Sequence, residues 1–208
     1  MATLLLRLSA PMQSWGAESL FDTRRTEKAP TKSGVLGMIA NAMGRDRDDS
    51  MDDLAAMKFG VRIDEPGVVI DDFQVARREG KKSNISHRYY LSDAVFVAAL
   101  ETDDADLLKK VEEALKAPKR HLYLGRKGCP LTLPLCLGVR ESSLLETLSV
   151  EKLQTRKKRS ASRNVEILYE TDEGTNLVKD VPLSYRVTKR EYGYRRIKTK
   201  VLAFTGEE

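Results

Sequence analysis

The chain is poor in the residues that build disulfide-linked or metal-bound folds. Its 208 residues include only two cysteines, Cys129 and Cys136, and two histidines, His87 and His121. Two cysteines cannot form a disulfide framework, and no histidine follows them at the spacing of a zinc site. We therefore expect no metal, no cofactor and a reducing, cytoplasmic setting, with a fold that depends on an ordinary hydrophobic core.

Long apolar runs are also missing. The longest ones, such as residues 4–6 and 94–100, are far shorter than the about 20 apolar residues that a helix needs to cross a bilayer. The first residues lack the basic segment and long apolar segment of a secretory signal. The sequence therefore argues against a membrane protein and a secreted protein.

Basic residues are in modest excess but unevenly distributed. Lys and Arg total 36 against 31 acids, which gives a net charge of +5. Three segments concentrate the positive charge, namely residues 77–90, 152–163 and 186–200, whereas acids gather at 46–53, 64–72 and 103–113. Such segregation favours a nucleic-acid partner, although solvated loops would give the same pattern.

Hydrophobic periodicity predicts an alternation of strands and helices. We expect strands at residues 3–8, 59–63, 68–75, 93–100 and near 139, and helices at 34–43 and 104–116. Ser33 is the expected N-cap of the first helix and Gly44 its C-terminal glycine. The order matches a ferredoxin-like βαββαβ unit, a layout shared by many RNA-binding folds, with a basic arm inserted at residues 76–89. Residues 1–140 would form this domain and residues 141–208 a small β-rich lobe.

A lysine–serine pair opens the first predicted helix, at Lys32-Ser33. The nucleotide-binding Walker pattern needs glycines immediately before the lysine and five residues earlier, where this chain has Thr31 and Thr26. The pattern therefore fails. Free N–H groups at the helix start, with Lys32 beside them, would suit one phosphate oxygen, and a plain capped helix is the alternative.

Catalytic candidates are few. His87, together with Tyr89 and Tyr90, could supply the acid and base of metal-independent RNA cleavage. A histidine beside an arginine is more often a polar contact, so we expect no catalytic residue. The acid pairs, such as Asp71-Asp72, are expected to be solvated.

Basic residues interleaved with aromatic ones are better evidence for function. In His87-Arg88-Tyr89-Tyr90 a base can stack on a ring while the guanidinium reaches a phosphate, unless the tyrosines pack on their own sheet. The loop Gly125–Gly128 carries Arg126 and Lys127 on a flexible backbone that could lie along phosphates. Tyr192–Arg196 has the same composition, which strand pairing explains equally well.

Several ordered motifs together resemble one family. The segments Leu6–Gly16, Arg24–Thr26 and Pro30–Gly37 look like the opening signature of CRISPR-associated protein 5. The segments Arg88–Ala94 and Leu122–Thr132 resemble its type I-E branch, and the likeness is strong through about residue 140.

This resemblance implies an α+β repeat-associated RNA-binding protein (RAMP) with a modified ferredoxin-like, RRM-like core, a thumb hairpin and a small C-terminal β lobe. Members of the branch cap the 5′ handle of the CRISPR RNA within the antiviral Cascade complex and do not cut it. They contact the backbone subunit and the large subunit that reads the PAM, close to target DNA, and take no small-molecule substrate. The alternative is a metal-independent endoribonuclease that processes repeat RNA, as in the type I-C branch.

The resemblance places Arg88 where the family has an arginine that contacts the handle. It also places the loop at Gln13, Ser14 and Trp15, with Arg24 and Lys32, on the surface near the handle. The basic run 152–163 matches no family motif, so its partner stays open. Together with the basic arms, the expected RNA-binding residues are Gln13, Ser14, Trp15, Arg24, Lys32, Arg77, Arg78, Lys81, Lys82, His87, Arg88, Tyr89, Arg126 and Lys127.

Overall fold

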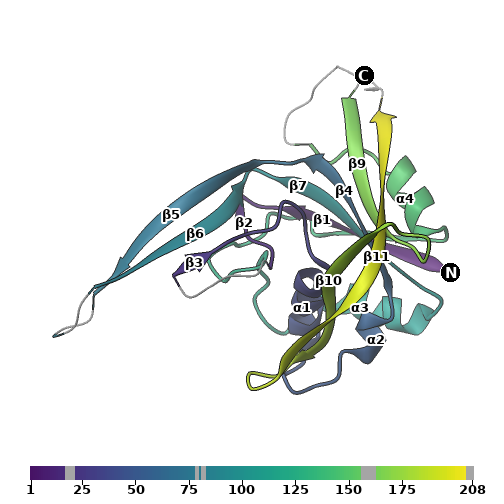
Figure 1. The fold of residues 1–208 in the computed structure, drawn as a ribbon. Coiled ribbons are helices and arrows are strands. Elements are labelled where there is room, and N and C mark those ends of the chain that lie inside the picture. The colour runs from purple at the N-terminus through teal and green to yellow at the C-terminus, as the bar shows by residue number, and fades with distance from the viewer. Residues whose placement is uncertain (17–21, 78–79, 81–82, 156–162, 205–208) are drawn as a thin grey trace.

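The computed structural model describes residues 1–16, 22–77, 80, 83–155 and 163–204. Figure 1 shows a large twisted sheet with helices packed against it and a hairpin that projects from one end. In the described part of the chain no helix is long and apolar enough to cross a membrane. The elements, in order, are β1 (Ala2–Ser9), β2 (Met12–Gln13), β3 (Thr23–Arg24), α1 (Lys32–Met43), α2 (Asp52–Ala55), β4 (Lys58–Glu65), β5 (Val68–Ala76), β6 (Asn84–Ser92), β7 (Val95–Thr102), α3 (Ala105–Lys116), β8 (Cys136–Arg140), α4 (Leu144–Val150), β9 (Arg163–Glu170), β10 (Asn176–Tyr185) and β11 (Arg190–Phe204).

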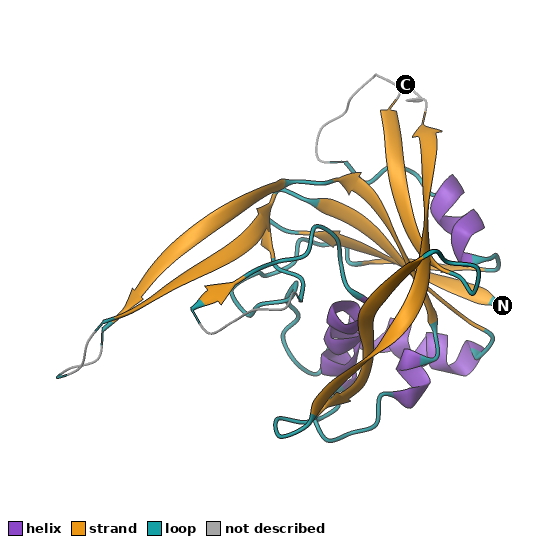
Figure 2. Cartoon of the chain, viewed as in Figure 1, coloured by secondary structure: helices purple, strands orange, loops and turns teal. Residues whose placement is uncertain are grey.

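The main sheet has seven strands in the order β10-β11-β9-β4-β7-β1-β8, and all neighbours are antiparallel. Its central strands read as continuous apolar runs because both of their faces are buried. Leu4, Leu6 and Leu8 of β1 pack with α1 and α3, whereas Leu5 belongs to the smaller core under α4. Figure 2 shows α4 apart from the other helices, which lie together.

Two helices form where the apolar period predicts them. Helix α3 buries one apolar face that includes Leu108 and Val111, and Asp104 caps it by accepting a hydrogen bond from the Leu107 N–H at 2.8 Å. Helix α1 begins two residues earlier than predicted. The hydroxyl of Thr31, rather than of Ser33, accepts the capping bond from the Gly34 N–H at 3.2 Å.

The projecting hairpin consists of β5 and β6. Residues 68–75 do form a strand, but β5 pairs with β6 and not with β4. Both edges of β4 are already occupied, by β7 and β9. The hairpin therefore spans residues 68–92 and is longer than the predicted arm at 76–89. Strands β2 and β3 pair with the outer edge of β6 and complete a second, smaller sheet.

The C-terminal strands continue the main sheet. Strand β9 pairs with β4 in the register Gly60↔Tyr169 to Ile63↔Glu166, and β11 then joins β9 to β10. The division of the chain at residue 140 stays a prediction, and hydrogen-bonded strands connect the two parts.

A buried ion pair ties the segment after α4 to the sheet. Arg62 and Asp64 are both buried, with Nε 2.6 Å from Oδ1. The Arg62 guanidinium also donates to the carbonyls of Leu148, Glu151 and Lys152 at 2.6–2.9 Å. These bonds satisfy a charge that would otherwise be costly to bury.

Candidate nucleic-acid interface

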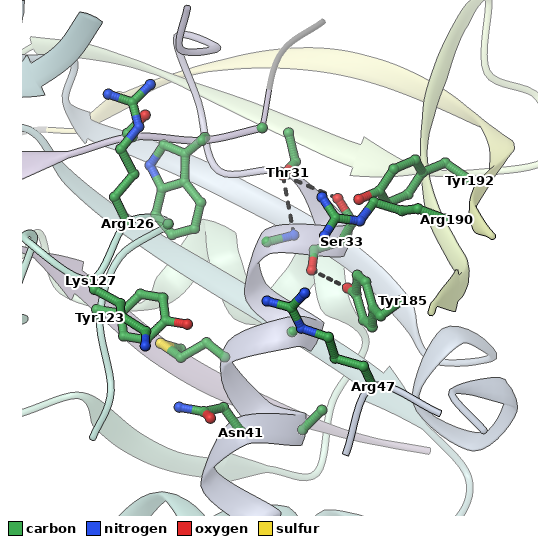
Figure 3. Close-up of a pocket in the computed structure, with 18 of the residues that line it drawn as sticks. Thr31, Ser33, Asn41, Arg47, Tyr123, Arg126, Lys127, Tyr185, Arg190 and Tyr192 are labelled. Atoms are coloured by element: carbon green, nitrogen blue, oxygen red, sulfur yellow. Dashed lines mark hydrogen bonds between the residues drawn. The ribbon is translucent and has the colours of Figure 1, made fainter. Parts of the chain in front are cut away.

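An open cleft of about 780 Å³ lies over helix α1. In Figure 3 the helix forms the floor, the loop with Tyr123, Arg126 and Lys127 stands on one side, and Tyr185, Arg190 and Tyr192 from β10 and β11 stand on the other. The walls therefore come from segments that are far apart in the sequence.

The loop wall depends on a close backbone approach. Ser14 donates its N–H to the Leu124 carbonyl at 3.1 Å, and Gly125 follows with φ +86°. A Cβ at this glycine would lie 1.5 Å from the Ser14 oxygen. Only glycine combines this dihedral with this contact, so Gly125 sets the position of Arg126 and Lys127.

The opposite wall is bound to the helix start. The Tyr185 hydroxyl donates to the Ser33 carbonyl, and its ring meets Tyr192 edge-on with centroids 6.4 Å apart. A Cβ at Gly37 would come within 3.3 Å of this hydroxyl, so the missing side chain leaves room for the tyrosine. Burial raises the pKa of Tyr185 above its ordinary value, which keeps the phenol protonated as a donor.

The cleft is strongly basic. Two of its arginines are neutralised by carboxylates, Arg45 by Asp53 and Arg120 by Asp46 at 2.7 Å. Within the described residues, the side chains of four others make no hydrogen bond or ion pair. These four are Arg24, Arg47, Lys127 and Arg190. In full, the cleft is lined by eight basic residues (Arg24, Arg25, Arg45, Arg47, Arg120, Arg126, Lys127 and Arg190) against the single acid Asp46.

Arg126 connects the cleft to the base of the hairpin. Its guanidinium donates to the carbonyl oxygens of Tyr89 at 3.1 Å and Arg24 at 2.9 Å. It also lies 4.6 Å above the centre of the Tyr90 ring. These contacts are to neutral groups, so the positive charge remains at the junction of hairpin and cleft.

Three predicted contact residues are buried instead. Gln13, Ser14 and Trp15 are each at most 5% exposed. The Gln13 amide donates to the carbonyls of Leu8 and Ala94, and its oxygen accepts from the Trp15 indole. Their side chains hold the N-terminal loop in place, and Ser14 and Trp15 also line the cleft, so their contact with RNA stays a prediction.

Lys32, also among the predicted contacts, is bound within the protein. Its side chain is buried, and its ammonium lies 3.0 Å from Glu170, which is 138 residues away. Burial lowers the pKa of Lys32, and the adjacent Glu170 partly offsets that effect. The backbone N–H donates to Asp180 at 2.7 Å, so a carboxylate of the chain itself occupies the predicted phosphate position.

The hairpin places two arginines side by side. Arg88 on β6 is in register with Arg24 on β3 and with Asp72 on β5. Arg88 is half-buried, it makes no salt bridge among the described residues, and its Nε has no hydrogen-bond partner there. Like charges at paired positions destabilise a sheet unless an anion lies between or beside them. Of the other predicted hairpin residues, Arg77 is exposed, whereas Arg78, Lys81 and Lys82 lie outside the described residues.

The histidine considered for catalysis is not assembled into a site with both tyrosines. His87 and Tyr89 share one face of β6, whereas Tyr90 lies on the other face beneath Arg126. The His87 Nδ1 is 2.9 Å from Asp71, and the ring packs edge-on against Phe73.

Several cleft residues were not among the predicted contacts. Arg190 and Tyr192 lie in or beside segments whose basic and aromatic composition was noted, but strand pairing was an equal explanation. Arg47 was hidden in an acid-rich segment. Tyr123 and Tyr185 carry no local signal, because only the tertiary fold brings them to the cleft.

Comparisons with known proteins agree with these features. The chain is 38% identical over 163 residues to "CRISPR system Cascade subunit CasD" of Escherichia coli (strain K12), which covers 67% of this chain and 72% of that one. A solved "CRISPR RNA-guided surveillance complex" contains a chain with a TM-score of 0.82 and 33% identity, covering 97% of this chain and 90% of that one.

A second structure, "Crystal structure of Cas protein", gives a TM-score of 0.78 at 38% identity and covers 96% of this chain and 94% of that one. A family model described as "CRISPR-associated protein (Cas_Cas5)" matches residues 3–198, nearly the whole chain. The chain therefore belongs to the CRISPR-associated Cas5 family.

Proposed function

We propose that the protein is the RNA-binding subunit of a Cascade surveillance complex that caps the 5′ handle of the CRISPR RNA without cutting it. The observation that carries this proposal is the cleft over α1, with eight basic residues, one acid and three tyrosines in its walls. Cations along a groove bind the phosphate chain, and tyrosines offer rings on which unpaired bases stack.

The paired arginines of the hairpin support the same ligand. Arg24 and Arg88 lie in register on adjacent strands, and Arg24 also lines the cleft. Asp72 lies in register with Arg88 on its other side, and a phosphate chain passing from the cleft to the hairpin would add an anion that both arginines can contact. Arg88→Ala should therefore weaken retention of the guide RNA without any change in RNA cleavage, and equal retention would remove Arg88 from the proposed site.

The fold fits a ferredoxin-like core with a thumb. The succession β1-α1-β4-β7-α3-β8 gives the expected βαββαβ order, with neighbours β8-β1-β7-β4 in the sheet. In this proposal β5 and β6 form the thumb, and the subunit acts in the cytoplasm. Its partners are the backbone subunit and the large PAM-reading subunit, near target DNA.

Salt dependence tests the cleft. Fluorescence anisotropy of a labelled handle RNA and a scrambled RNA would be followed from 50 to 200 mM salt. For single strands each phosphate contact contributes about 0.7 to the slope of log K against log salt. The double variant Arg47→Ala/Lys127→Ala removes two such contacts, so the negative slope should become shallower by about 1.4. Lys109→Ala/Lys110→Ala, which removes the same charge from the exposed face of α3, should not change it.

If the two double variants behave alike, the cleft is not the RNA site. If the wild-type chain binds handle and scrambled RNA equally at 200 mM salt, it is a general basic protein and not a handle-binding subunit.

The same proposal predicts no ribonuclease activity. Purified protein incubated with repeat RNA in EDTA should leave the RNA intact. Specific cutting that disappears in His87→Ala would instead establish the endoribonuclease.

A further inference from the structure

Along one side of strand β11 we infer a further contact surface, on which the single-stranded RNA of the cleft continues; this inference rests on the proposed function. Successive residues of a strand point to opposite sides, and from residue 190 to residue 200 one side of β11 carries only basic and aromatic residues. This β11 row consists of Arg190, Tyr192, Tyr194, Arg196, Lys198 and Lys200. Such a composition suits a phosphate chain with unpaired bases.

The β11 row begins inside the basic cleft. Arg190 and Tyr192 line the cleft, and Tyr192 meets Tyr185 edge-on. The next member, Tyr194, is 61% exposed, and the Lys179 ammonium lies 5.6 Å from the centre of its ring. In Figure 1 β11 runs as one long twisted strand from its turn with β10 to the far end of the sheet, so the row leads out of the cleft.

Solvent exposure alone does not account for the row. The opposite side of the outer part of β11 is exposed as well, at Thr199, Val201 and Ala203, and none of these residues is charged. Nearer the cleft the opposite side does carry a cation, Arg195, but Asp180 neutralises it. Cations that served only solubility would have no reason to gather on one of two exposed sides.

Much of the positive charge in the row is free. Lys198 is paired with Glu173 at 2.8 Å. Arg196 contacts a neutral group, the Gly174 carbonyl at 3.5 Å, and Lys200 has no hydrogen bond or ion pair within the described residues. The charges of Arg196 and Lys200 are therefore available to phosphates.

The spacing of the row suits a nucleic-acid strand. Alternate residues of a β-strand are about 6.8 Å apart, which is about the axial rise of two nucleotides in one strand. From Tyr194 to Lys200 the row is therefore about 20 Å long, the length of about six nucleotides at that spacing. Because tyrosine rings stack on unpaired bases, the occupant is a single strand. We assign it to the RNA in the cleft, since Arg190 and Tyr192 belong to both surfaces.

Extended RNAs test this surface. Handle RNA, and handle RNA with six added uridines at the 5′ or the 3′ end, would be compared by fluorescence anisotropy from 50 to 200 mM salt. One of the two extensions should raise the affinity of the wild-type chain by about tenfold. It should also make the negative salt slope steeper by about 1.4, because Arg196 and Lys200 add two phosphate contacts.

Three charge variants separate the row from charge in general. Arg196→Gln/Lys200→Gln should lose the gain and the added slope while binding unextended handle RNA like wild type. Lys109→Gln/Lys110→Gln removes the same charge from α3 and should keep both. Lys200→Gln/Thr199→Lys keeps the net charge but moves one cation to the other side of β11, so it should lose about 0.7 of the slope.

Tyr194→Leu tests stacking, because it removes an exposed ring and no charge. It should reduce the gain in affinity and keep the slope. The inference is overturned by no gain from either extension, by equal losses in the β11 and α3 double variants, by an unchanged slope in the variant that moves the cation, or by an unchanged gain in Tyr194→Leu. The proposed function fails separately, if the wild-type chain does not prefer unextended handle RNA to scrambled RNA.

Discussion

Removing the Asp180 carboxylate should destabilise the protein strongly. Asp180 is 3% exposed and accepts bonds from Arg195 and from the Lys32 N–H. Asp180→Ala leaves a buried guanidinium without a counter-charge, which costs about 3–5 kcal/mol. With a urea slope of about 2–3 kcal/mol/M, the unfolding midpoint should fall by about 1–2.5 M. Circular dichroism during urea titration measures this shift.

Asp172 provides the control, because it is exposed in the turn after β9 and its side chain has no bond within the described residues. Asp172→Ala should change the free energy of unfolding by no more than about 0.5 kcal/mol. Asp180→Asn should lie between the two, since its amide oxygen still accepts a bond. If Asp180→Ala unfolds at the wild-type urea concentration, the Asp180 carboxylate does not stabilise the contacts among β10, β11 and α1, and the reasoning fails.

Three further predictions concern single groups. Tyr185→Phe removes the donor to the Ser33 carbonyl and should cost about 1 kcal/mol in urea unfolding. Gly125→Ala should cost more than about 1 kcal/mol, because φ is +86° and the new Cβ meets a backbone oxygen. Gly128→Ala, whose Cβ meets nothing within 4 Å, is its control, and equal costs would contradict this account. Burial raises the pKa of the Cys129 thiol, so thiolate is scarce at pH 8 and a thiol reagent should react slowly until the protein unfolds. Rapid reaction in the native state would contradict the burial.

The sequence predicts the elements whose signals are local. The apolar period predicts α3, and the apolar runs predict β1 and β7, because these patterns need no information from elsewhere in the chain. The strand at residues 68–75 was also found. Its partner was not, because that depends on β9 occupying the edge of β4 from more than 90 residues away.

The site was harder to predict than the fold. Lys32 looks like a phosphate ligand in its own segment, and only the distant Glu170 and Asp180 reveal it as a buried cation. Arg126 was predicted to bind RNA and lines the basic cleft, but its neutral partners Tyr89 and Tyr90 come from the hairpin, which its own segment does not reveal. The sequence shows where charge is abundant, whereas tertiary contacts decide which charges remain free.

The bonds of Arg62 impose an order of events during synthesis on the ribosome. A nascent chain that ends at residue 140 contains Arg62 and Asp64 but lacks Leu148, Glu151 and Lys152, whose carbonyls accept hydrogen bonds from the Arg62 guanidinium. It also lacks β9, so one edge of β4 has no partner strand. In that nascent chain an edge of β4 is unpaired and the Arg62 guanidinium lacks three of its hydrogen-bond acceptors, whereas the complete protein has neither feature. Pairing of the β4 edge must therefore wait until residues 148–170 have left the exit tunnel, and β10 and β11 complete the sheet only after that.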